Sequence, residues 1–131
     1  MKLKKCGGTI MGKYALKVNE KGARFNLVAA NGEIIGVSEQ YTSESAARNG
    51  IDSVRKNAPV AEIEDQTVAE VEGKRNPKFE IFKDKAGEFR FRLKAGNGEP
   101  ILASEGYVSK AGCKNGIDSV RRNADSEIKK V

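Results

Sequence analysis

The chain contains two copies of one segment, and this internal repeat constrains its fold more than any other feature. Residues 24–58 reappear as residues 90–124 at a constant offset of 66, and 21 of these 35 residues are identical. The longest identical block, Asn49–Arg55, returns as Asn115–Arg121. A repeat of this length indicates two copies of one supersecondary unit.

Each copy begins with a pattern typical of antiparallel strands. Apolar residues alternate with polar ones over residues 14–18 and again over residues 25–29, which is the period of half-buried strands. The dipeptides Asn31-Gly32 and Asn97-Gly98 then predict tight hairpin turns of type I′. A third strand follows each turn, so the sequence predicts three consecutive strands in each copy.

A helix of about 14 residues is predicted after the third strand of each copy. Ser43 and Ser109 precede the two helices as N-caps. The apolar residues of each helix fall on one stripe: Ala47, Ile51, Val54 and Ala58 in the first copy, and Cys113, Ile117, Val120 and Ala124 in the second. Short final strands are predicted around Ile63 and Ile128.

Gly50 and Gly116 occupy the middle of the two predicted helices. Glycine at such a position costs about 1 kcal/mol relative to alanine. We therefore expect each helix backbone to approach the sheet closely, next to Tyr41 or Tyr107.

A unit of this size buries too little surface to be stable alone, so the two copies are expected to share one core. The predicted fold is α+β, with two β-β-β-α-β motifs in a single, mainly antiparallel sheet and both helices on one face. The first repeat spans residues 12–65 and the second spans 76–131, with a linker at 66–75. Residues 1–11 are predicted to be a disordered extension.

Five runs of the second copy form a distinctive pattern: Lys78–Ile81, Lys83–Ala95, Gly96–Glu99, Ser104–Tyr107 and Ser109–Ile117. They resemble the YegP-like family of small bacterial proteins, a family of unknown function, and the resemblance covers residues 12–131. It implies tandem β3-α-β motifs in one sheet, with the C-terminal strand of each motif exchanged into the other. It implies no active site. The first copy departs from the family pattern at Ala15, Ala23, Gly36 and residues 45–47.

The composition argues against several kinds of site. The chain has no histidine and no tryptophan, which removes the commonest general base and metal ligand and the best cation–π platform. No Cys-x-x-Cys pair, calcium loop or phosphate-binding loop is present. We therefore expect no catalytic residue, no cofactor and no metal. Cys6 lies near the N-terminus and Cys113 in a predicted helix, so the two do not resemble the disulfide framework of a small secreted protein, and we expect a reducing cytoplasm. No apolar run reaches the roughly 20 residues of a membrane span.

One cluster of residues predicts a partner. The net charge of +6 and the pI near 9.4 favour association with anions. Strand alternation places Arg90, Arg92 and Lys94 on the outer face of the sheet, and Phe82 projects beside them from the preceding strand. Cations with an interleaved aromatic ring are typical of proteins that bind single-stranded nucleic acid. The alternative is a solvated face that discourages stacking of sheets.

Three functions are consistent with this sequence. The leading interpretation is a non-enzymatic binding or interaction module that uses the open sheet face. Nucleic-acid binding through Phe82, Arg90, Arg92 and Lys94 is the specific alternative. The third is an enzyme with a groove shared by the repeats, which would hold Tyr41, Tyr107, Asp52 or Asp118, although the two aspartates could instead pair with Arg55 and Arg121. A monomer is expected, because the internal pseudo-dimer reduces the need for further assembly.

Overall fold

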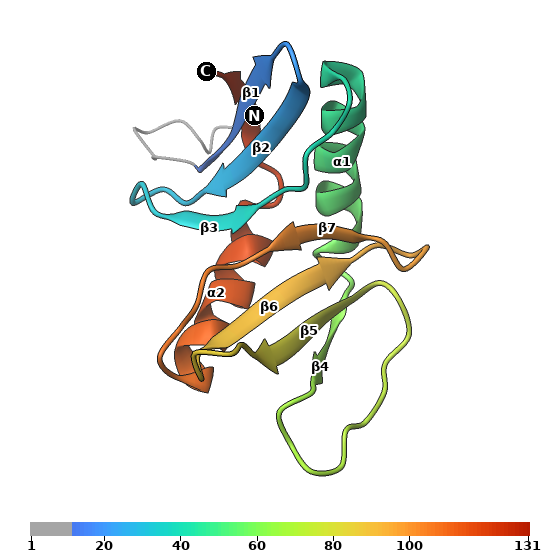
Figure 1. Ribbon diagram of the computed structural model, residues 1–131, viewed down its shortest axis with the longest axis vertical. Helices are drawn as coiled ribbons and strands as arrows, with labels where there is room; N and C mark the ends of the chain where they lie inside the picture. Colours follow the sequence, from blue (N-terminus) through green and yellow to red (C-terminus); the bar gives the residue numbers. More distant parts are fainter. Residues whose placement is uncertain (1–11) are drawn as a thin grey trace, which may run out of the picture.

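Each repeat forms three strands, a helix and a fourth strand in the computed structural model, which describes residues 12–131 (Figure 1). The first repeat contains β1 (Lys13–Asn19), β2 (Gly22–Val28), β3 (Ile34–Val37), α1 (Glu44–Asn57) and β4 (Glu62–Asp65). The second contains β5 (Lys78–Lys83), β6 (Phe89–Lys94), β7 (Pro100–Ala103), α2 (Lys110–Asn123) and β8 (Glu127–Lys130). The predicted disordered extension and Cys6 lie outside the described residues. Neither helix is long and apolar enough to span a membrane.

All eight strands join one sheet in the order β4-β5-β6-β7-β3-β2-β1-β8. Neighbouring strands are antiparallel except at the two edges, where β4 runs parallel to β5 and β8 runs parallel to β1. The last strand of each repeat is therefore paired with the first strand of the other. This topology confirms the predicted single sheet and the exchange of the C-terminal strands.

The two repeats meet where β3 pairs with β7 at the centre of the sheet (Figure 1). Val37 lies opposite Ala103, and these residues occupy equivalent positions in the two repeats because their numbers differ by 66. An approximate twofold axis therefore passes through this pair, as expected for an internal pseudo-dimer.

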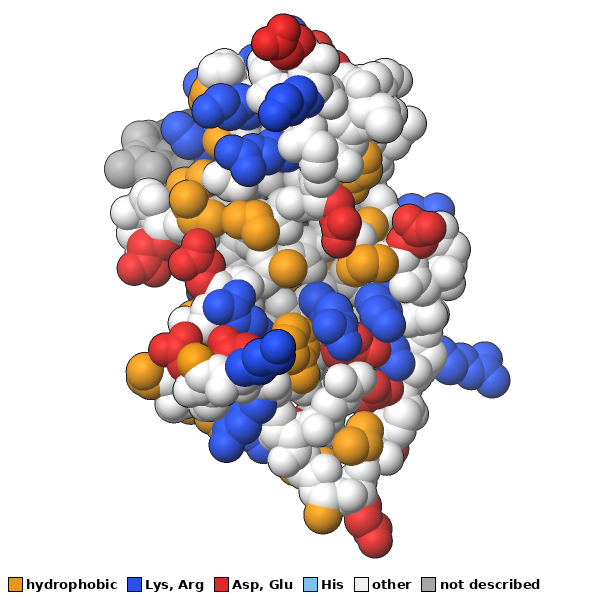
Figure 2. Space-filling view, viewed as in Figure 1, with side chains coloured by type: hydrophobic (Ala, Val, Ile, Leu, Met, Phe, Trp, Pro, Cys, Tyr) orange, Lys and Arg blue, Asp and Glu red, His pale blue; other side chains and the backbone are white. Residues whose placement is uncertain are grey.

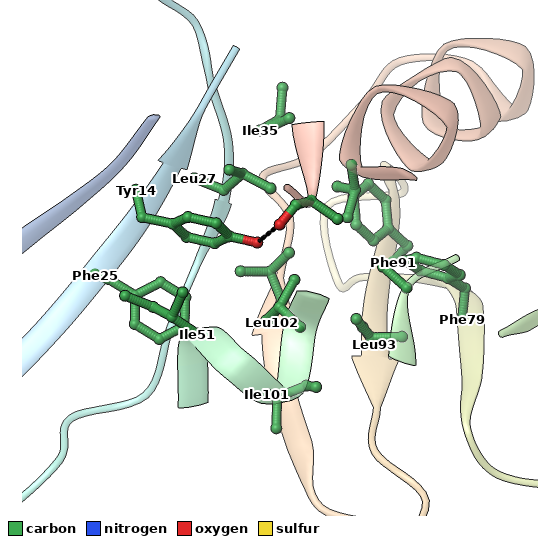
Figure 3. Packing of buried hydrophobic residues seen from close by; sticks show 14 of the residues in the cluster. Tyr14, Phe25, Leu27, Ile35, Ile51, Phe79, Phe91, Leu93, Ile101 and Leu102 are labelled. Carbon is green, nitrogen blue, oxygen red and sulfur yellow. Dashed lines mark hydrogen bonds between the residues drawn. The ribbon is translucent and has the colours of Figure 1, made fainter. Parts of the chain in front are cut away.

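The helices pack on one face of the sheet, and each contacts strands of both repeats. Helix α1 contacts β1, β2 and β7, and α2 contacts β6, β3 and β2. Their side chains form one continuous core with the inner residues of the strands (Figure 3). The Tyr14 hydroxyl donates a hydrogen bond of 2.7 Å to the carbonyl of Ala124 at the end of α2, so the core also contains a polar link between the repeats.

The local signals at the helix ends are confirmed. The Ser43 side chain accepts a hydrogen bond from the backbone of Ala46, and Ser109 does the same for Gly112.

The hairpin prediction was only partly right. Gly32 has a φ of 90°, but no residue other than glycine has a positive φ among residues 12–131. The loop of residues 30–32 is therefore a type I turn completed by a left-handed glycine, and not a type I′ turn.

The two mid-helix glycines lie where they were expected to be needed. A Cβ on Gly50 would collide with the Tyr41 hydroxyl, and one on Gly116 would collide with the Tyr107 hydroxyl. The Tyr41 ring stacks on Phe25, with 6.2 Å between ring centroids. Glycine thus allows each helix to lie directly against the tyrosine that precedes it.

Candidate functional site

The outer face of the sheet, opposite the helices, carries the residues predicted to bind nucleic acid. Phe82 of β5 lies opposite Arg90 of β6. Arg92 and Lys94 follow on the same side of β6, because alternate residues of a strand share a face. The structure therefore brings all four predicted residues together on this face.

The same face also holds a buried carboxylate that the sequence analysis missed. Glu80 lies opposite Arg92, and its side chain is only 4% exposed. Its oxygens lie 2.6 Å from Arg92 Nε, 3.3 Å from Lys94 Nζ and 3.3 Å from Lys78 Nζ. Alternation from Phe82 to Glu80 was a visible signal that this acid faces outward.

A second acid, Glu64 of β4, extends this network towards the edge of the sheet. Its side chain accepts hydrogen bonds from Lys78 Nζ at 2.8 Å and Gln66 Nε2 at 2.7 Å. The backbone N–H of Lys74, in the loop between β4 and β5, donates a third at 2.8 Å. We call Glu64, Lys78, Glu80, Arg92 and Lys94 the ion-pair network.

The remaining two predicted residues are also engaged within the protein. Arg90 Nε lies 2.6 Å from a carboxylate oxygen of Asp84. The Arg92 guanidinium lies 4.5 Å from the centroid of the Phe82 ring. Intramolecular acids therefore already balance the basic row on this half of the outer face.

Hydrogen bonds set the protonation of the network. Those donated by Lys78, Gln66 and the backbone of Lys74 hold the pKa of Glu64 at about 2, against its ordinary 4.5. Burial favours a higher pKa for Glu80, but the hydrogen bond and charge of Arg92, together with the charge of Lys94, outweigh burial and lower it. Both carboxylates are therefore ionised at neutral pH.

We expect the free energy of unfolding to decrease as pH falls from about 4.5 towards 2. Glu64 and Asp65 both have a folded-state pKa of about 2, below the ordinary 4.5 and 3.8. Since the unfolded chain binds these protons first, the stabilisation is complete above the ordinary pKa and is lost as pH falls through the folded pKa. Urea unfolding at pH 7, 4, 3 and 2 measures it. Constant stability over this range would contradict the expectation, and Glu64→Gln should flatten the profile.

The outer face over β1, β2 and the exchanged strand β8 has a different electrostatic character. Lys17 of β1 lies opposite Arg24 of β2, and Lys129 of β8 lies beside Ala15 of β1. All three cations are exposed, and no carboxylate of residues 12–131 lies within 4.0 Å of their nitrogens. Residues 1–11 contain no acidic residue. We call Lys17, Arg24 and Lys129 the basic face.

Two residues of the basic face, Lys17 and Arg24, line a shallow hollow of about 240 Å³. Ala15, Lys17, Arg24, Asn26 and Val131 contribute to its lining. In Figure 2, Lys and Arg side chains gather over β1 and β2, whereas over β5 and β6 they are mixed with acids. The predicted residues lie on β5 and β6, but the cations of the basic face, which have no acidic partner among residues 12–131, lie on β1, β2 and β8.

The two tyrosines named for the enzyme hypothesis line separate depressions, each formed by both repeats. Tyr41 lines one depression of about 490 Å³ with Asn49 and Glu99. Tyr107 lines another of about 490 Å³ with Glu33. The structure therefore places the two tyrosines in separate depressions.

The two helix aspartates named for catalysis form ion pairs, and the cysteine of α2 is buried. Asp52 lies 3.3 Å from Arg55, and Asp118 lies 3.8 Å from Arg121, which are the pairings that the sequence analysis offered as the alternative to catalysis. Cys113 is a buried free thiol. Burial raises its pKa to about 11, so it is not an activated nucleophile.

The chain is similar in sequence to bacterial proteins of unknown function. A family model described as "domain of unknown function (DUF1508)" matches residues 19–65 and 84–129. The UPF0339 protein YegP of Yersinia pestis is 40% identical over 119 residues, which cover 90% of this chain and 93% of that protein. A UPF0339 protein of Stutzerimonas stutzeri is 65% identical over 51 residues, 39% of this chain and 46% of that relative's length.

A solved structure shows the same fold. The solution NMR structure of yegP from E. coli, a protein of unknown function, superposes with a TM-score of 0.75 at 32% identity. The match covers 95% of this chain and 96% of that one.

Proposed function

We propose that this chain, which belongs to the DUF1508 family of unknown function, is a non-enzymatic binding module. It binds a single strand of nucleic acid across the outer face of its sheet. The resemblance to YegP-like proteins is confirmed by the Yersinia relative. That membership assigns no activity, so the proposal rests on the surface of this chain.

The observation that carries the proposal is the basic face. Lys17 and Arg24 are directly opposite one another, and like charges in such a pair destabilise a sheet. A phosphate group bound between them would replace this repulsion with two attractions. Lys129 lies two strands away from Arg24, across β1, so a backbone that carries one phosphate per nucleotide has several cations within reach.

The second half of the outer face supplies a surface for bases. The Arg92 guanidinium and the Phe82 ring form one stacked pair, and exposed bases stack on both kinds of planar group. Val37 and Ala103 lie at the centre of the sheet between the two halves. A strand that crosses the sheet would therefore meet cations first, then a short apolar strip, then the stacked pair.

The arrangement of ionisable groups supports binding rather than catalysis. Every carboxylate with a lowered pKa among residues 12–131 forms an ion pair: Glu44, Glu64, Asp65, Glu80 and Asp84. Such pairs lower a carboxylate pKa without creating a proton acceptor. The buried free thiol of Cys113 is consistent with the cytoplasmic location that we propose for the protein.

The proposal is tested by fluorescence anisotropy with labelled 12-nucleotide single-stranded RNA and DNA at low and physiological salt. Lys17→Ala/Arg24→Ala/Lys129→Ala is expected to weaken binding roughly tenfold and to reduce the salt slope by about 2, since each lost phosphate contact contributes roughly 0.7. The matched control, Lys56→Ala/Lys114→Ala/Arg122→Ala, removes the same charge from exposed positions on the helices.

A second variant examines the residues predicted from the sequence. Phe82→Leu/Arg90→Ala removes the ring and one cation but keeps the partners of Glu80. It is expected to weaken binding severalfold, with little change in stability. Equal losses in the basic-face variant and the helix control would show that net charge alone acts, and absence of binding by the parent protein would refute the proposal.

A further inference from the structure

The exchanged strands create two ion pairs between the repeats. Glu44 at the start of α1 lies 3.0 Å from Lys130 at the end of β8. Lys110 at the start of α2 lies 2.8 Å from Asp65 at the end of β4. Each pair therefore joins the helix of one repeat to the last strand of the other.

These two ion pairs are equivalent in the repeat, but their charges are reversed. Glu44 and Lys110 each follow the N-cap serine of their helix, and Asp65 and Lys130 are each the last residue of the exchanged strand. If two copies of the first repeat were paired, Glu44 would meet an aspartate. If two copies of the second were paired, Lys110 would meet a lysine.

Packing at the centre of the sheet also distinguishes the first repeat from the second. Gly36 of β3 and Leu102 of β7 occupy equivalent positions beside the pseudo-twofold axis. A Cβ on Gly36 would lie only 2.6 Å from Leu102 Cγ, and Leu102 is 2% exposed. Two first repeats would leave a void here, and two second repeats would bring two leucines into one space.

We propose that the interface between the repeats selects an unlike partner. It accepts the unlike repeat and rejects a second copy of the same repeat. The short connection between β4 and β5 supplies the unlike repeat from the same chain, so the chain closes on itself as a monomer. The selectivity comes from the Glu44–Lys130 and Asp65–Lys110 pairs and from the contact of Leu102 with Gly36. The outer face does not add to this selectivity. If two second repeats paired, β8 of one would lie beside β5 of the other, and Lys129 would form a favourable pair with Glu80.

Two variants of the full-length chain with unchanged net charge test the electrostatic part. Glu44→Lys/Lys110→Glu makes both ion pairs between the repeats like-charged. Glu44→Lys/Lys130→Glu reverses one ion pair and leaves both oppositely charged. The two variants share the loss of the Glu44–Arg48 contact and the lysine at the start of α1. Lys110→Glu also adds a favourable acid to the first turn of α2, so a lower stability of Glu44→Lys/Lys110→Glu reports the pairs between the repeats.

The ratio of folded to unfolded protein in urea should be roughly tenfold lower for Glu44→Lys/Lys110→Glu than for the control. This follows because two ion pairs at the surface, one of them partly buried, each change from attraction to repulsion. Light scattering should give the mass of one chain for the parent and the control. Equal stability of the two variants, or a parent protein that is already a dimer at micromolar concentration, would overturn the proposal.

Discussion

Replacement of Gly36 by leucine is expected to destabilise the protein by about 1 to 3 kcal/mol, which is the usual cost of adding atoms to a packed core. The three atoms nearest to a Cβ at residue 36 all belong to the Leu102 side chain, with Cγ and Cδ2 at 2.6 Å and Cδ1 at 2.9 Å. Leu102 is buried and has no solvent to move into. Urea unfolding followed by circular dichroism measures the change.

The reciprocal variants show whether shape or composition matters at this position. Leu102→Gly should lower the free energy of unfolding by about 2 to 5 kcal/mol, because it leaves a cavity in the core. In Gly36→Leu/Leu102→Gly the leucine approaches from the other strand across the pseudo-twofold axis, so the double variant should be more stable than the sum of the two single changes predicts. Strict additivity would show that Gly36 and Leu102 are not coupled.

Replacement of Glu80 by alanine is expected to destabilise the protein by about 2 kcal/mol. The carboxylate accepts a charged hydrogen bond from Arg92 at 2.6 Å, and such bonds contribute about 1.5 to 3 kcal/mol. Its removal also leaves Lys78 and Lys94 with one acid fewer on a crowded face. Glu62→Ala is the matched control, since Glu62 on the neighbouring strand β4 lies on the same face of the sheet as Glu80 but is exposed.

The same variant has an expected effect on binding. Removal of Glu80 leaves Arg92 and Lys94 without their acidic partner, so the affinity of the folded variant for single-stranded nucleic acid should rise severalfold at low salt. The measurement is the anisotropy titration carried out well below the unfolding temperature of the variant. An affinity unchanged from that of Glu62→Ala would show that Arg92 and Lys94 do not contact the nucleic acid.

Several features of the fold were predictable because they depend on short-range patterns. Alternation along residues 14–18 and 25–29 predicted the first strands, and Ser43 predicted the start of α1. The cost of glycine inside a helix predicted the close contact between Gly50 and Tyr41. The type I′ turn was wrongly predicted at Asn31-Gly32, because the dipeptide is compatible with more than one turn and the flanking strand register decides among them.

The candidate site was less predictable. Strand alternation correctly placed Phe82 and the Arg90–Lys94 cations on one face, but their chemical environment depends on the strand beside them. Glu80 was within reach of the same alternation argument and was missed. Glu64 was not, since it arrives on β4 from the other repeat, and Lys129 reaches the basic face by the corresponding exchange of β8.

The sequence by itself determined the repeated unit, its helix caps, its buried stripes and the need for the two repeats to share a core, because these follow from local conformational preference and hydrophobic periodicity. Only the tertiary structure decided which cations are neutralised and which are not. Ion pairing depends on distances of a few ångströms between segments that lie far apart in the chain. For the same reason the reversed pairs Glu44–Lys130 and Lys110–Asp65 became visible only once the strands were exchanged.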